Sequence, residues 1–419
     1  MFCTRQYSGC IAQYTWVLSS APTVAGHEDT EVINGMSSDA RARVPVRRKG
    51  FSDSRTTAVT VRVGMWLGVA VALCMATGLI SHFIQHPQPW FWWPTRPVWL
   101  YRFTQGLHVI SGIAAIPLLV VKLWSVWPKL FARPVIGGVT RQLERLSILV
   151  LVGSMIFQLS TGLLNIAQWY VFGFFFPPAH YAMAWVAVGA IVVHVGVKLP
   201  VIRRALGEPV DSADVTGGGV VGPSRRNVLV GAAAATAVAT IATAGQTVPW
   251  LKRVSVLAPR SGDGPQGLPV NRTALAAGVV RSARSPEYRL TVVGPSGSRS
   301  FTLAELQAMP QSTHELPIAC VEGWSASAQW TGIVLADLIS AVGGSPESDV
   351  RMISLEPPGP YSRTTLPARH ARDSATLIAL RLNGGELDLD HGYPCRLIAP
   401  TRPGVLQTKW LTRIEVVGA

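Results

Sequence analysis

The 419-residue sequence has few charged residues and few cysteines. Charged residues make up 14% of the chain and hydrophobic residues 48%, and the mean hydropathy is +0.30. A charge content this low is unusual for a soluble protein and favours an integral membrane protein. The five cysteines are scattered and odd in number, and no C-x-x-C pattern occurs. Neither a disulfide framework nor a zinc site is therefore indicated.

The charge that is present is unbalanced, with a formal net charge of +14. The basic residues flank apolar runs and form no basic face, so we expect no nucleic-acid partner. Residues 1–57 are polar and have no periodic apolar pattern. We expect them to form a disordered cytoplasmic tail, with Met36 as an alternative start.

Five apolar runs approach the roughly 20 residues that span a bilayer. Four of them are strongly apolar and the fifth is Ala-rich, and they cover residues 63–84, 106–127, 146–165, 180–202 and 227–249. Arginine and lysine gather before the first run, between the second and third, and between the fourth and fifth. The alternate loops, "WFWWPTRPVWLY" and "WYVFGFFFPP", are aromatic and nearly uncharged. By the positive-inside rule, the N-terminus is cytoplasmic and the chain after the fifth run is extracytoplasmic.

The fifth run begins with a twin arginine, Arg225 and Arg226, in "SRRNVL". A twin arginine before a weakly apolar run such as "VGAAAATAVATIATAG" is typical of a Tat export signal. Tat cargo commonly folds and takes up its cofactor before export. The alternative is an ordinary span with two positive-inside arginines. We expect the run to be retained as an anchor.

From about residue 251 the composition becomes that of a soluble domain. Short apolar segments such as "YRLTVVG", "MISLE", "CRLIAP" and "LTRIEVV" alternate with Gly/Pro turns and predict strands. The clearest helical patterns are "TLAELQAM" and "GIVLADLISAV". The sequence therefore predicts one α+β domain.

Ionisable residues inside membrane spans are functional candidates. His108 lies near the outer end of the second predicted span and His180 at the outer end of the fourth. The two are at matching depth and are placed to clamp one haem as axial ligands. The alternative is that they only form hydrogen bonds between helices. His194 is fourteen residues beyond His180, about 21 Å along a helix, and is the candidate ligand of a second haem.

Residues 60–205 resemble the four-helix cytochrome b subunits of membrane formate dehydrogenases and hydrogenases. In that family a histidine at the start of the first span helps to bind the inner haem, but this chain has Met65 there, in "RVGMW". Lys122 lies at the inner depth of the second span. His194 therefore has no evident histidine partner, and the resemblance supports one b-type haem better than two.

Cys320 lies in the stretch "LPIACVEGWSASAQW". A lone cysteine can be a nucleophile, a soft metal ligand or a small buried apolar residue. The longer segment "CVEGWSASAQWTGIVLADLI" resembles the part of the sulfite oxidase family that supplies the molybdenum-ligating cysteine. That family includes the catalytic subunit of periplasmic methionine sulfoxide reductase. The resemblance implies that Cys320 is the catalytic residue that ligates molybdenum.

The C-terminal stretch "LNGGELDLDHGYPCRLIAPTRPGVLQTKWLTRIEVV" is similar to the ending of the same family, and "LPVNRTALAAGVV" looks like its first cofactor contact. The cofactor that this resemblance implies is molybdenum-molybdopterin, with the residues Asn271, His391, Arg396, Gln407, Thr408 and Lys409 binding it. The pterin phosphate and polar rings require such cationic and hydrogen-bonding groups. Taken singly, Arg396 and Lys409 are equally well explained as surface charges, and Asn271 as a helix N-cap.

Two departures from sulfite oxidases concern the substrate. Sulfite oxidases have an arginine-bearing segment after the cysteine, whereas this chain has "VEGWSAS". The sequence ends at Ala419, directly after the predicted molybdenum domain, so we expect the family's dimerisation domain to be absent. Both features favour the methionine sulfoxide reductase branch. Tyr361 and Arg363 are candidates for the wall of the active site.

The sequence as a whole predicts a multidomain protein, with an all-α transmembrane helix bundle followed by an α+β molybdopterin-binding domain. The bundle has four spans plus a fifth anchor span. The expected boundaries are a tail (1–57), a cytochrome b-like membrane domain (58–205), a cytoplasmic linker (206–223), a Tat-like anchor (224–250), a linker (251–267) and the molybdopterin domain (268–419).

We expect a multi-pass cell-membrane oxidoreductase that transfers an oxygen atom to or from a small molecule such as a methionine sulfoxide. An integral b-type haem would relay electrons to or from quinone or another membrane carrier. Two alternatives remain open. In the first, the spans are a haem-free anchor of an exported molybdenum enzyme. In the second, the chain is a non-enzymatic redox or scaffold protein whose outer domain has lost its cofactor.

Overall fold

The computed structural model describes residues 55–130, 138–207, 224–258 and 264–417. Most of the expected tail, the alternative start Met36 and most of the linker 206–223 lie outside these residues, as does part of the linker 251–267. Residues from Lys49 to Ala419 form one compact unit, and all the elements described below belong to it.

The N-terminal half of this unit is helical. Each of its five long helices is apolar and long enough to cross a membrane. Their bounds are α1 Thr57–Gln85, α2 Leu100–Leu130, α3 Val139–Ile166, α4 Phe176–Gly207 and α5 Arg225–Thr243. The first four contain their predicted apolar runs. The fifth ends earlier than expected, at Thr243, and two short 3₁₀ helices, Ala244–Gln246 and Pro249–Leu251, follow it.

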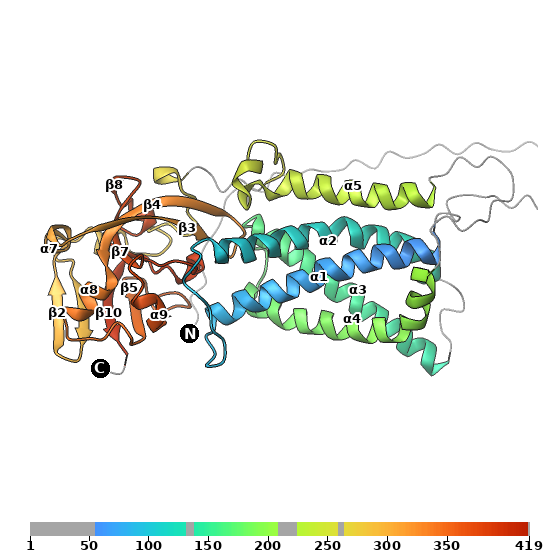
Figure 1. Ribbon diagram of the computed structural model, residues 1–419, viewed down its shortest axis with the longest axis horizontal. Coiled ribbons are helices and arrows are strands. Elements are labelled where there is room, and N and C mark those ends of the chain that lie inside the picture. The colour runs from blue at the N-terminus through green and yellow to red at the C-terminus, as the bar shows by residue number, and fades with distance from the viewer. Residues whose placement is uncertain (1–54, 131–137, 208–223, 259–263, 418–419) are drawn as a thin grey trace, which may run out of the picture. The chain divides into compact units, whose positions relative to one another are not determined.

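The helices lie side by side in Figure 1, with α1 against α2 and α4, α3 against α4 and α2, and α5 against α2. Apolar side chains such as Leu119, Met155 and Ala187 are buried between them. The outward faces are apolar as well, with Leu149 68% and Val192 65% exposed. A surface helix of a soluble protein would carry polar residues there.

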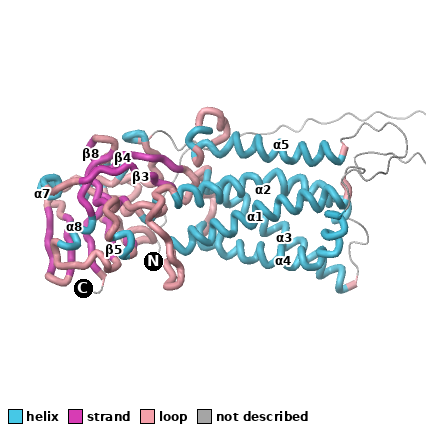
Figure 2. Tube along the Cα trace, in the orientation of Figure 1, coloured by secondary structure: helices cyan, strands magenta, loops and turns pink. Residues whose placement is uncertain are grey.

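The C-terminal part contains two sheets (Figure 2). The first has the order β2-β1-β10-β5-β6 and is antiparallel except for the parallel pair β1 and β10. Its strands are β1 Leu290–Gly294, β2 Gly297–Phe301, β5 Val350–Ser354, β6 Arg363–Leu366 and β10 Leu411–Val416. The second has the order β3-β4-β7-β8, with β9 also paired to β7. Its strands are β3 Ser312–Ala319, β4 Ser325–Val334, β7 Leu377–Leu382, β8 Gly385–Glu386 and β9 Arg396–Ile398.

Short helices connect the strands: α6 Val280–Ala283, α7 Leu303–Ala308, α8 Leu335–Ser340 and α9 Ala368–Ala371. The helix predicted in "TLAELQAM" is α7, which begins with a capping box between Thr302 and Glu305. The pattern "GIVLADLISAV" is helical only from Leu335, because Gly332 pairs with Ala379 in the ladder between β4 and β7. The prediction of a helical region followed by a mixed sheet domain is confirmed.

A common core joins the two sheets. Leu290 and Ile414 from the first sheet, Ile378 and Leu397 from the second, and Leu338 of α8 belong to one buried cluster. The hairpin of β3 and β4 lies in the second sheet, and its connecting turn carries Cys320. The fold therefore holds this cysteine on a turn between two paired strands.

Candidate functional site

Cys320 is fully buried at the turn between β3 and β4. Its backbone N–H donates to the carbonyl of Trp324 at 2.9 Å, and the N–H of Gly323 donates to the carbonyl of Cys320 at 3.0 Å. Burial, followed by the nearby Glu322 carboxylate, raises the pKa of the Cys320 thiol. A bound cation would reverse this effect, because a metal deprotonates a coordinating thiol.

Cys320 lines a cavity of about 1110 Å³ that reaches both the sheet domain and the helices. This is slightly above the range, about 300–1,000 Å³, that ligand pockets usually occupy. The residues predicted from the sequence that line it are Asn271, Cys320, Tyr361, Arg363, His391, Arg396, Gln407, Thr408, Lys409, His108 and His180. His194 is not among the residues of this cavity.

Arg396 is a buried cation in this cavity, with 3% of its surface exposed. Its guanidinium donates to the carbonyls of His391 at 2.9 Å and Gln407 at 3.1 Å, and it lies over the ring of Trp330. Burial lowers the pKa of Arg396 to about 9, so the group remains a cation at neutral pH. Arg396 is therefore not a surface charge.

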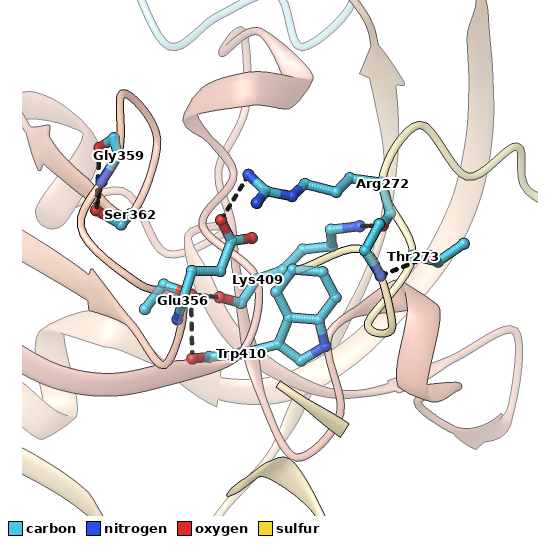
Figure 3. Close-up of polar contacts among 9 residues, drawn as sticks. Arg272, Thr273, Glu356, Gly359, Ser362, Lys409 and Trp410 are labelled. Carbon is cyan, nitrogen blue, oxygen red and sulfur yellow. Dashed lines mark hydrogen bonds and ion pairs between the residues drawn. The ribbon is translucent and has the colours of Figure 1, made fainter. Parts of the chain in front are cut away.

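Lys409 is held by two backbone carbonyls, of which Figure 3 shows that of Arg272. Its Nζ donates to the carbonyl of Arg272 at 2.6 Å and to that of Asp390 at 2.9 Å. The Arg272 side chain pairs with Glu356 at 3.0 Å. Burial, together with nearby Arg396, lowers the pKa of Lys409 to about 7. An anionic ligand beside this amine would favour its charged form.

Asn271 approaches the cavity from a loop and His391 from the end of a 3₁₀ helix, Leu389–His391. The Nδ2 of Asn271 is 3.7 Å from the Cys320 sulfur, and the next helix begins only at Val280, so Asn271 is not an N-cap. The Nε2 of buried His391 donates to the Pro265 carbonyl at 2.6 Å, which leaves Nδ1 without the proton in a neutral ring.

The side chains of Gln407 and Thr408 are engaged within the sheet domain. Gln407 exchanges two hydrogen bonds of 2.8 Å with the backbone of Ala399, and the Thr408 hydroxyl is 2.7 Å from that of Thr364. These bonds fix the loop that carries Lys409. Sequence resemblance alone did not indicate this bracing role.

His108 on α2 and His180 on α4 face one another, with ring centroids 6.5 Å apart. His108 Nδ1 donates to the Cys74 carbonyl of α1 at 2.9 Å. The Thr161 hydroxyl of α3 donates to the Phe157 carbonyl at 2.6 Å and lies 3.1 Å from His180 Nδ1, from which it accepts. Both protons are thus on Nδ1, and no hydrogen bond involves either Nε2 within the described residues.

This pattern is typical of imidazole metal ligands, whose second nitrogen usually donates to a carbonyl or another acceptor. Metal–imidazole bonds are about 2 Å long, so two rings on opposite sides of one ion have centroids roughly 6 Å apart. Gly78 adds room beside His108, because a Cβ there would be 3.2 Å from the ring. The geometry fits two axial ligands of one haem.

His194 lies apart from this pair, half-exposed on α4. Lys122 donates from Nζ to the Thr60 carbonyl at 2.8 Å and lies against Gly64. No histidine ring is paired with His194 in the part of the chain that the structure describes. Those same residues contain no cluster of three or more His, Cys, Asp or Glu side chains that could hold a metal ion.

Comparison with known proteins identifies the sheet domain. Residues 277–419 match the family model described as the oxidoreductase molybdopterin binding domain. These residues are a molybdopterin oxidoreductase domain. The buried thiol, the two cations and the large cavity described above all fall in this domain or on its border.

The chain is also similar to curated proteins. The chain is 29% identical over 141 residues to a putative protein-methionine-sulfoxide reductase subunit, YedZ1, of Azospira oryzae, a match that covers 33% of this chain and 53% of that protein. It is also 28% identical over 155 residues to mitochondrial sulfite oxidase of Drosophila melanogaster. This match covers 31% of this chain and 27% of that protein. The chain thus spans about half or less of the length of these relatives.

Among solved structures, the sulfane dehydrogenase SoxCD of Paracoccus pantotrophus is similar at 23% identity, covering 31% of this chain and 38% of that one. Its TM-score is 0.29.

The structure adds residues to the border of the molybdopterin domain that sequence reasoning missed. Glu322, Gln105, Asn165 and Tyr170 line the same cavity, and Gln168 contacts Glu322. The sequence partly indicated two of them. Gln105 and Asn165 are polar residues in or beside predicted apolar runs, where a polar side chain is a functional candidate. Gln168 and Tyr170 lie in the loop between α3 and α4, where the sequence did not single them out as site residues.

Proposed function

We propose that this chain is a membrane-bound oxidoreductase that depends on a molybdenum cofactor. The molybdenum cofactor would supply oxygen-atom transfer at an extracytoplasmic centre. His108 and His180 would hold a b-type haem, which would supply the electron relay. One observation carries the proposal: a single cavity contains both the buried Cys320 thiol and the facing pair of imidazoles. Two redox centres in one cavity would be close enough to exchange electrons.

The residues around Cys320 fit molybdopterin. Cys320 would ligate the metal, while Arg396 and Lys409 would hold the anionic phosphate and Asn271 and His391 the polar ring system. The bound cofactor would supply two-electron oxygen-atom transfer. The chain's own groups bury the site, orient the cofactor and keep a cation next to its phosphate.

The membrane assignment rests on the five apolar helices and their exposed apolar faces. Exposed apolar surface on this scale marks contact with lipid or another apolar partner. With the basic residues in the predicted inner loops, α1 starts at the cytoplasmic side. We propose the domain boundaries that the sequence predicts. We also propose that Arg225 and Arg226, at the start of α5, belong to a Tat signal.

The substrate class follows from the chemistry of the site and from one relative. No arginine occurs in the turn from Val321 to Trp324, so an anion such as sulfite would have no cation in that turn. The relative YedZ1 is named as a methionine-sulfoxide reductase subunit. We therefore favour a sulfoxide. Its reduction consumes two electrons and two protons and yields the sulfide and water, with a quinol or another membrane carrier as the reductant.

Metal content tests the proposal directly. Full-length protein purified in detergent should contain one molybdenum and one iron per chain, measured by mass spectrometry, and should show a haem absorbance spectrum. Cys320→Ser should lose the molybdenum-dependent activity while the haem spectrum remains.

Other outcomes would favour the alternatives. Protein that contains molybdenum but no iron would indicate that the helices are a haem-free anchor. Folded protein with neither metal, or full molybdenum activity in Cys320→Ser, would overturn the proposal.

A further inference from the structure

The turn that follows Cys320 makes its outward hydrogen bonds with the helical region of the chain. The Val321 carbonyl accepts from Asn165 Nδ2 at 3.1 Å and from Gln105 Nε2 at 3.4 Å. Gln105 belongs to α2 and Asn165 to α3. One carbonyl beside the cysteine thus accepts from two helices, through side chains that are 60 residues apart in sequence.

The next residue, Glu322, is held in the same way. Glu322 is 8% exposed, and its carboxylate accepts from Gln168 Nε2 at 2.6 Å and from the Tyr170 hydroxyl at 2.7 Å. Burial, and then the bond to Glu322, raises the pKa of Tyr170, so that its hydroxyl remains a donor. A buried carboxylate needs such partners, and leaving it unpaired would be costly.

Gly323 completes the contact. Its carbonyl accepts from the Thr247 hydroxyl, in the segment after α5, at 2.5 Å. Its φ is +90°, and a Cβ built there would be 3.0 Å from Val109 and 3.5 Å from Ile166. Glycine is thus needed both for the backbone conformation and for the close approach to α2 and α3.

We propose that Gln105, Asn165, Gln168, Tyr170 and Thr247 form a socket that positions the metal-binding turn. The molybdenum site is then completed by the helical region and is not a property of the molybdopterin domain alone. The inference rests on the proposed function, in which Cys320 is the metal ligand. The five residues act through Val321, Glu322 and Gly323 and are positioning residues.

Two features make the socket decisive for the turn. Within its own loop the turn has two backbone hydrogen bonds and one from the Cys320 thiol to the Glu322 carboxylate at 3.7 Å, whereas the socket supplies five from side chains. The socket also sets the distance between the proposed centres, because Gly323 packs on Val109, the residue after His108. A turn that shifted in this socket would move the thiolate relative to both the cofactor and the histidine pair.

The test uses Tyr170→Phe and Gln168→Leu in the full-length protein in detergent. Tyr181→Phe is the matched control, because Tyr181 lines the same cavity and its hydroxyl makes no hydrogen bond within the described residues. Amide hydrogen exchange is measured on peptides covering residues 319–324. A charge-assisted hydrogen bond is worth about a factor of ten or more, so exchange should accelerate about tenfold in Tyr170→Phe and Gln168→Leu. The control should exchange like the wild type.

The second readout is the EPR signal of molybdenum(V) in partly reduced protein, which reports the geometry of the metal's ligands. It should change in Tyr170→Phe and stay unchanged in Tyr181→Phe. Wild-type exchange rates and an unchanged signal in both socket variants would overturn the inference. If the wild type contains no molybdenum, the proposed function fails, whereas the exchange comparison still shows whether the socket holds the turn.

Discussion

His108 and His180 lie with their ring centroids 6.5 Å apart, and each donates its Nδ1 proton to an oxygen of a different neighbouring helix. The two donations fix both rings in the tautomer whose Nε2 carries the lone pair. The pair is therefore preorganised for a metal ion between the rings. It is held by the packing of four helices, because the two acceptors come from α1 and α3.

Loss of either ring should remove the haem. We expect His108→Ala and His180→Ala each to abolish the haem absorbance of purified protein, because a b-type haem is held by its axial ligands and by packing alone. His82→Ala is the control, since His82 stacks on Tyr181 at the outer end of α1 and should leave the spectrum intact. Full haem content in either ligand variant would contradict the assignment.

The contact between His180 Nδ1 and the Thr161 hydroxyl should also contribute to haem affinity. Thr161→Val removes the acceptor of the Nδ1 proton while keeping the shape of the side chain. Loss of such an outer partner typically costs about 10–100-fold in metal affinity. We expect haem titration of Thr161→Val to show this weakening. Thr236→Val in α5, whose hydroxyl donates only to the Ala232 carbonyl, should bind haem as the wild type does.

His194 should not bind a second haem. It is half-exposed and has no histidine near it among the described residues, and the Lys122 amine lies at the matching depth of α2. We expect His194→Ala to leave the iron content at one per chain. A fall to half the wild-type iron would instead establish a second haem.

Arg396 should support both the fold and the cofactor. Arg396→Met would leave the carbonyls of His391 and Gln407 without their donor in a buried site, which should destabilise the domain by about 3 kcal/mol. Calorimetry and molybdenum content measure the two effects. Arg413→Met is the control, since Arg413 is an exposed residue paired with Glu415, and such surface pairs contribute about 0–1 kcal/mol. Equal stability and equal molybdenum in the two variants would refute this role.

The pKa of Lys409, lowered to about 7, predicts a pH-dependent reactivity. In cofactor-free protein the amine should be neutral above pH 7 and react with an acylating reagent at pH 8, which mass spectrometry can follow relative to exposed Lys252. Because an unfolded lysine has a pKa of about 10.4, the unfolded state binds more protons between about pH 7 and 10.4. The stability of cofactor-free protein should therefore rise with pH in this window. Cofactor loading should suppress the labelling, and equal labelling with and without cofactor would contradict the proposed phosphate contact.

Local patterns in the sequence predicted the elements well and their ends less well. The first four apolar runs all lie inside helices, because run length and composition are local properties. The segment from Gly332 to Val334 was predicted as helix but belongs to β4, because the ladder with β7 extends that far. Pairing with a strand about 45 residues away outweighs a local helical pattern.

By itself the sequence determined the helical region and the mixed sheet domain, since these depend on composition and period. The set of cofactor candidates came from its resemblance to the sulfite oxidase family. Only the tertiary structure decided how Cys320 is held. Its turn is bonded by side chains from α2, from α3 and its following loop, and from the segment after α5, at separations of up to 216 residues. Hydrogen bonds at such separations leave no periodic trace in the sequence, because they exist only once the helices and the sheet domain have packed together.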